Sequence, residues 1–184
     1  MGLIPSFPNH VGFPLRSLTE TKFMNPLSLP AVDELVAPFV ASLKSVMETM
    51  VQSRCDTSPL KTIEEGVHLY GISAMIGMSG GLSGALTFST TPEAACRILE
   101  RMTGMEAHEP DEFVRDAIGE ISNIVAGYGK REIDRYELKL GLPQVLIGEG
   151  IILYTPRWSR HLWLHAETDV GPCTLDIGFS ENPT

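Results

Sequence analysis

Three polar residues in the middle of the chain, Asp116, Glu120 and Asn123, are separated by spacings of four and three. On a helix that turns about 100° per residue, this spacing places them within roughly 60° of one another. The carboxamide can accept one hydrogen bond and donate another without carrying charge, and the two carboxylates accept hydrogen bonds. Any solvated surface helix can present such a row, however. The spacing alone therefore leaves a functional and a purely solvated interpretation open.

The segment around these residues has the pattern of an amphipathic helix. Apolar residues recur at spacings of three and four, at Phe113, Ala117, Ile121, Ile124 and Tyr128. The polar row lies about 120° from the centre of this apolar face, so we expect it to point outward.

Two glycines bear on this helix. Glycine in a helix interior, as at Gly119, lowers helix stability by about 1 kcal/mol relative to alanine. Because this cost is usually kept where another backbone comes close, we predict such an approach at Gly119. Gly127 continues the polar row by one turn and leaves it without a side chain that could block a partner. We expect the helix to begin at Glu109-Pro110-Asp111-Glu112 and to extend at least to Gly127, or as far as Asp134, because basic residues favour its end.

Two histidines present a competing metal-site hypothesis. His161 and His165 are four residues apart, which is a metal-ligand spacing on a helix. They occur in His-Leu-Trp-Leu-His, whose alternation is typical of a strand, where four residues span roughly 13 Å. This distance is too long for one ion. We therefore interpret both as surface histidines and predict that the chain has no metal site of its own.

The polar row and its flanks resemble a known family. The run Asp116-Ala-Ile-Gly-Glu120-Ile-Ser-Asn123-Ile-Val-Ala-Gly127 is similar to the signature helix of the CheC/CheX/FliY phosphatases, chemotaxis proteins that dephosphorylate phosphorylated CheY. Gly80 to Phe88 resembles the glycine-punctuated hairpin before this helix, and Leu142 to Gly150 resembles the strand after it. The likeness covers roughly residues 36–180.

The resemblance implies roles for individual residues. Asn123 would orient the water that attacks the regulator's phosphoaspartate, and Glu120 would pair with the regulator's active-site lysine. Asp116 and Gly127 would face the partner, although Asp116 could equally be a surface carboxylate without one. The phosphorylated regulator would supply Mg²⁺, so this chain would need no cofactor.

The number of Glu-x-x-Asn motifs distinguishes two branches of this family. Relatives with two active sites carry a second Glu-x-x-Asn on an earlier helix, whereas Glu34 and Glu48 are followed three residues later by Ala37 and Val51. This points to the single-site CheX branch, whose members form dimers by sheet pairing, and we expect a homodimer. The alternative is a non-catalytic CheC-like module of a flagellar switch or signalling complex. The intact Glu120 and Asn123 favour the phosphatase.

Composition limits the class of protein. The 184 residues carry a formal net charge of −9, which disfavours a nucleic-acid partner. Three cysteines without a CxxC spacing indicate a reducing compartment. The sequence has no apolar run of transmembrane length and no signal peptide, so we expect a cytoplasmic protein that does not bind membranes.

The order of predicted elements favours a two-layer α+β fold, with helices packed on a mostly antiparallel central sheet. Residues 1–30 contain five prolines and are interpreted as an arm, followed by a single domain over 31–184. The predicted elements are a helix over Val36–Gln52 with Pro38 in its first turn, a polar loop over Cys55–Gly66, strands over Val67–Met78 and Leu82–Ser89, a helix from Thr91 to Gly104, the signature helix, and strands over Tyr136–Leu140, Gln144–Gly148, Ile151–Thr155, His161–Glu167 and Cys173–Phe179.

Overall fold

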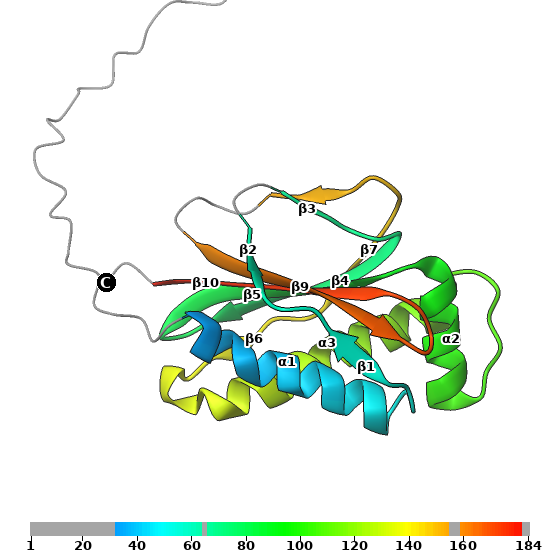
Figure 1. Ribbon diagram of the computed structural model, residues 1–184, viewed down its shortest axis with the longest axis horizontal. Coiled ribbons are helices and arrows are strands. Elements are labelled where there is room, and N and C mark those ends of the chain that lie inside the picture. The colour runs from blue at the N-terminus through cyan, green and yellow to red at the C-terminus, as the bar shows by residue number, and fades with distance from the viewer. Residues whose placement is uncertain (1–31, 64–65, 155–158, 182–184) are drawn as a thin grey trace, which may run out of the picture.

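The computed structural model describes residues 32–63, 66–154 and 159–181. The predicted arm over residues 1–30 lies outside them. Three helices cover one face of a central sheet, and a small two-stranded sheet stands on the opposite side (Figure 1). The helices are α1 (Val32–Thr49), α2 (Pro92–Thr103) and α3 (Glu112–Glu132), with a short 3₁₀ turn η1 (Asp134–Tyr136) after α3.

The central sheet is antiparallel at every pairing. Its order is β1-β9-β10-β5-β4-β6, while β2 also pairs with β9, β7 pairs with β4, and β3 and β8 form the small sheet. The strands are β1 (Cys55–Thr57), β2 (Lys61–Thr62), β3 (Val67–His68), β4 (Ile72–Ser79), β5 (Leu82–Thr90), β6 (Lys139–Leu140), β7 (Gln144–Ile147), β8 (Ile152–Leu153), β9 (Arg160–Thr168) and β10 (Cys173–Glu181). This confirms the predicted α+β class with helices on a mostly antiparallel sheet.

The longest strands meet at a tight glycine hairpin. Strands β4 and β5 pair from Ile72–Thr90 to Met78–Gly84 and turn at Gly80-Gly81. Gly80 has φ 150°, and a Cβ there would lie 2.6 Å from the carbonyl oxygen of Glu137. Only glycine fits this turn, because the chain between α3 and β6 passes directly against it.

Short local signals define where α2 and α3 begin. The Thr91 side chain accepts a hydrogen bond from the Ala94 N–H at 3.2 Å, and α2 ends at Gly104 in the left-handed conformation. Asp111 caps α3 by accepting from the Val114 N–H at 3.0 Å. Both helices therefore begin and end close to the predicted positions.

Helices α1 and α3 pack closely at one glycine. The ring of Phe39, which is fully buried, occupies the place where a Cβ of Gly129 would lie. Leu43, Val46 and Met47 on the same side of α1 are buried with it. The core thus lies between the helical layer and the sheet.

Two expectations for the first part of the domain are wrong. Helix α1 begins at Val32, so Pro38 lies inside the helix and not in its first turn. The predicted polar loop over Cys55–Gly66 contains β1 and β2, which pair with β9. These strands are too short to show an alternating pattern, and their hydrogen-bond partners come from a strand far along the chain.

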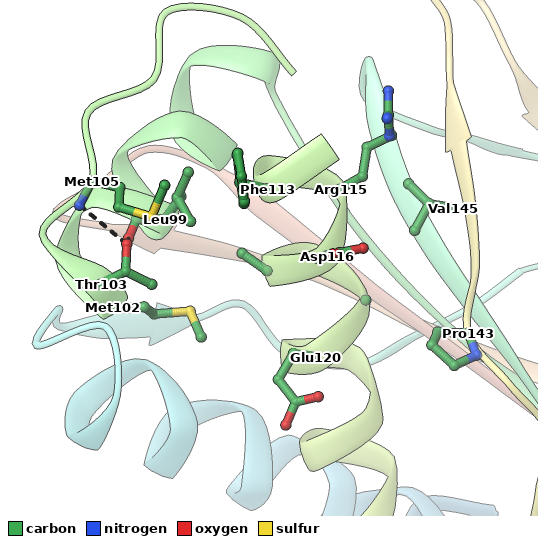
Figure 2. A pocket seen from close by; sticks show the side chains of 12 residues that line it. Leu99, Met102, Thr103, Met105, Phe113, Arg115, Asp116, Glu120, Pro143 and Val145 are labelled. Atoms are coloured by element: carbon green, nitrogen blue, oxygen red, sulfur yellow. Dashed lines mark hydrogen bonds between the residues drawn. The ribbon is translucent and has the colours of Figure 1, made fainter. Parts of the chain in front are cut away.

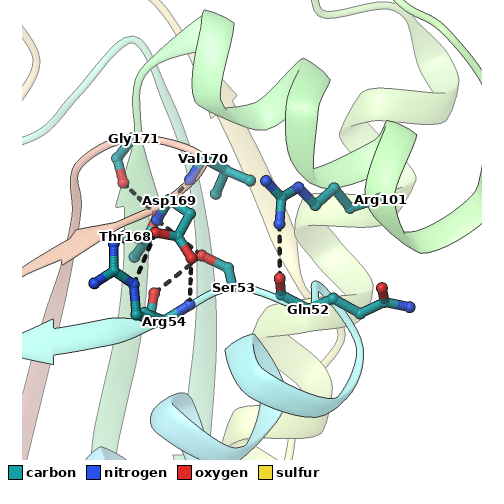
Figure 3. Close-up of polar contacts among 8 residues, drawn as sticks. All are labelled: Gln52, Ser53, Arg54, Arg101, Thr168, Asp169, Val170 and Gly171. Carbon is teal, nitrogen blue, oxygen red and sulfur yellow. Dashed lines mark hydrogen bonds and ion pairs between the residues drawn. The ribbon is translucent and has the colours of Figure 1, made fainter.

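A polar cluster holds β1 against the turn between β9 and β10 (Figure 3). Asp169 accepts hydrogen bonds from the Arg54 backbone N–H at 2.9 Å and from its guanidinium Nε and Nη2 at 3.1 and 2.9 Å. Arg101 of α2 donates from Nη1 to the carbonyl oxygen of Gln52 at 2.6 Å. The end of α1, the start of β1 and α2 are therefore tied together.

Strand boundaries differ from the prediction in two other places. The strand expected over Val67–Met78 is interrupted, and its first part pairs with β8 in the small sheet, not in the central one. Tyr136 belongs to η1, and β6 begins at Lys139. Among the described residues, no helix is long and apolar enough to span a membrane.

Candidate functional site

Helix α3 packs against the core along a wide face. Its buried residues are Val114, Ala117, Ile118, Gly119, Ile121, Ser122, Val125, Ala126 and Gly129. At about 100° per residue, this face is centred near Ile118. The polar row of Asp116, Glu120 and Asn123 then lies about 170° from that centre, so it points more directly away from the core than the expected 120°.

The two ends of the predicted apolar face are not buried. Phe113 and Tyr128 are 47% and 46% exposed, whereas Ala117 and Ile121 are buried as expected. Phe113 is about 140° from the centre of the buried face and only about 50° from the centre of the polar row. The pattern of three-and-four spacings placed this aromatic ring on the wrong side of the helix.

The side chains of Asp116, Glu120 and Asn123 are all exposed. Within the described part of the chain, their side chains form no hydrogen bond or ion pair. Their polar atoms are therefore solvated and available to an external group. The structure places these three predicted site residues in one outward row on a rigid, well-packed helix, from which side chains can be positioned accurately.

The two glycines of α3 have different surroundings. A Cβ on Gly127 would meet nothing within 4 Å, which fits the expectation of an unobstructed surface. A Cβ on Gly119 would contact the side chains of Pro143 and Val145 at 3.6 and 3.8 Å. The expected close approach of another backbone at Gly119 is wrong, because the neighbours are side chains of the β7 segment at ordinary contact distance.

A hollow of about 570 Å³ adjoins the polar row (Figure 2). Asp116 and Glu120 line it, but Asn123 does not. Side chains from the end of α2 stand on one side of α3, and Pro143 and Val145 stand on the other. The sequence analysis did not identify this hollow, because it is formed by three segments that only the fold brings together.

The histidine hypothesis needs one correction. His161 is buried, not on the surface, and its Nδ1 lies 3.2 Å from Asp176 Oδ2. Its ring occupies the space above Gly178, and Leu153 of the small sheet lines the same part of the sheet face. His165 is partly exposed. Both lie on β9, as the alternating pattern predicted.

The family follows from the comparison with known proteins. The family model described as "Chemotaxis phosphatase CheX" matches residues 72–167, which is 96 of the 184 residues and runs from β4 to β9 through α3. The chain belongs to the CheX family. A "CheY-P phosphatase CheX" from Thermotoga maritima is 37% identical over 59 residues, covering 32% of this chain. The chain aligns with 38% of the length of that relative.

Solved structures extend the likeness to the whole described domain. The chemotaxis protein CheX from Vibrio vulnificus is 25% identical with a TM-score of 0.74, over 80% of this chain and 99% of that one. A CheX from Borrelia burgdorferi, solved as a CheX-CheY-BeF3-Mg complex, is 18% identical with a TM-score of 0.65, over 80% of this chain and 98% of that one. The fold of the domain is therefore the CheX fold.

Proposed function

We propose that this CheX-family chain hydrolyses the phosphoaspartate of a CheY-type response regulator. One observation carries the proposal: Glu120 and Asn123 lie one turn apart on the face of α3 that points away from the core, exposed and free of partners among the described residues. The names of two relatives support it, since one is a CheY-P phosphatase and the other was solved with CheY.

The proposed chemistry needs little from this chain. Water attacks the phosphorus, the bond from phosphorus to the aspartyl oxygen breaks, and inorganic phosphate and the free carboxylate are released. The regulator contributes Mg²⁺ and a lysine, which neutralise charge on the phosphoryl group. What remains is to place the water in line with the leaving oxygen, and the carboxamide of Asn123 can accept one of its hydrogen bonds and donate another.

Glu120 has a different proposed task. Its carboxylate pairs with the regulator's lysine and fixes the docked orientation, since charge-assisted hydrogen bonds are stronger than neutral ones. Asp116, one turn before Glu120, and Gly127, two turns after it, extend the surface that the regulator covers. In this proposal, Mg²⁺ belongs to the regulator, and this chain holds no metal of its own.

The test uses a purified regulator phosphorylated by a small phosphodonor, in Mg²⁺. Loss of the phosphoryl group is followed with and without this protein. We expect a catalytic amount of the protein to speed the loss, because it acts through many turnovers. An unchanged rate at saturating protein would contradict the proposal and favour a non-catalytic module. The predicted homodimer is tested separately by light scattering.

A further inference from the structure

The hollow beside the polar row has an exposed apolar wall. Met102 near the end of α2 and Met105 just after it face Phe113 at the start of α3, and Asp116 and Glu120 form the adjoining side (Figure 2). Met105 and Phe113 are 42% and 47% exposed. Large side chains of this kind, grouped beside a candidate site, mark interaction surfaces more often than single exposed apolar residues do.

Phe113 faces nearly the same side of α3 as Glu120. It precedes Glu120 by seven residues, or two helical turns, and lies within about 20° of it around the helix axis. A surface that reaches Glu120 and Asn123 from outside therefore also covers Phe113. Methionine at the facing wall adds a flexible, polarisable contact that adapts to a partner's shape.

We propose that this groove, formed by Met102, Met105 and Phe113 beside Glu120, is the docking site for an exposed apolar side chain of the response regulator, next to the lysine that Glu120 pairs with. The inference rests on the proposed function and adds to it the part of the surface that selects the regulator. Asn123 acts on the reaction, whereas the groove acts on binding.

Charge and continuity favour a regulator as the occupant. The groove shares Asp116 and Glu120 with the polar row, and Arg115 lines the same hollow, so the charged lining is negative by one and suits an occupant that brings a cation beside an apolar group. A second copy of this chain carries a net charge of −9 and would have to approach two carboxylates. An aromatic ring in a partly enclosed hollow is also the kind of contact that anchors a protein interface.

The test separates binding from turnover with matched variants. Phe113→Ser removes the ring, and Phe113→Leu keeps an apolar side chain. Tyr154→Ser removes an aromatic ring that is 75% exposed and directly follows β8 of the small sheet. KM and kcat are measured with phosphorylated regulator, and Kd with regulator carrying BeF₃ and Mg²⁺. Thermal melting checks that each variant is folded.

We expect Phe113→Ser to raise KM and Kd on the order of tenfold while kcat stays within about twofold. Phe113→Leu should recover most of the affinity, and Tyr154→Ser should resemble the wild type. If the wild type is active and Phe113→Ser has unchanged KM and Kd, the docking role of the groove is contradicted and the proposed phosphatase function stands. A wild type that binds through Phe113 without speeding dephosphorylation would overturn the proposed reaction and support the groove. A wild type that neither binds nor reacts would overturn both.

Discussion

At the scale of single residues, the proposed function assigns binding of the partner and placement of the water to different side chains. Glu120 carries charge and suits the first task, and Asn123 is neutral and suits the second. Both side chains are exposed, while the opposite face of α3 is packed into the core. A change at either position can therefore be expected to alter function without altering the fold.

Asn123→Ala should lower the rate of stimulated dephosphorylation by about 100-fold or more, because a misplaced water loses the geometric advantage of the docked complex. Stability should change by no more than about 0.5 kcal/mol, since the side chain is exposed and makes no contact that the core needs. Single-turnover assays and thermal melting measure the two effects. Turnover within a fewfold of the wild type would exclude the water-positioning role.

Glu120→Gln should weaken binding to a BeF₃-loaded regulator more than Glu120→Asp does. The first change replaces a charge-assisted hydrogen bond with a neutral one, which costs about 1 kcal/mol or about fivefold in Kd. The second keeps the charge and shortens the side chain by one methylene. Titration calorimetry compares the three proteins, and equal affinity of the Gln variant and the parent would argue against a partner cation at Glu120.

At the scale of elements, α3 depends on α1 for its position. Gly129→Ala should destabilise the domain, because the new methyl group would overlap the fully buried ring of Phe39. Overpacking of this kind costs about 1–3 kcal/mol, against a gain in helix propensity of up to about 1 kcal/mol. We expect a net loss, measured by urea unfolding.

Gly127→Ala is the matched control on the same helix. Its methyl group would meet nothing within 4 Å, so stability should rise by up to about 1 kcal/mol. The same methyl group stands on the polar row and should weaken binding of the regulator. Equal stability changes in the two alanine variants would mean that the contact with Phe39 does not restrict α3.

The elements that sequence analysis predicted well are those with signals in adjacent residues. Thr91 and Asp111 begin α2 and α3 as expected, because a cap needs only a side-chain oxygen and an N–H three residues later. The polar row followed from helical spacing in the same way. Strands β1 and β2 were missed because three-residue and two-residue segments become strands only when β9 supplies their partners.

Phe113 and His161 were misplaced for a related reason. Whether a residue at the end of a helix or on the outer face of a sheet is buried depends on what lies over it. Phe113 lines an open hollow together with residues at the end of α2, and Leu153 of the small sheet shares with His161 a hollow that local spacing does not reveal. The groove and the buried His161–Asp176 pair are thus products of the whole fold.

At the scale of the whole molecule, the proposed function makes the complex with the regulator the active unit, and it would divide the chemistry between two chains. Helix α3 has its polar row on the outer surface, where Asp116, Glu120 and Asn123 offer three oxygen-bearing side chains along an open face. Mg²⁺ requires a near-octahedral set of ligands and usually completes it with water and substrate phosphate. The row alone is a poor match to that requirement.

Adding Mg²⁺ to the isolated protein should therefore leave its melting temperature unchanged, because only a ligand that binds the native state raises stability. EDTA should stop the dephosphorylation of the regulator while leaving the melting curve of this protein as it was. Melting is followed by circular dichroism with and without excess Mg²⁺, and Glu120→Ala serves as the control. A rise in melting temperature that needs both Mg²⁺ and Glu120 would show that the polar row binds the metal directly. The proposal that the regulator alone holds the Mg²⁺ would then be wrong.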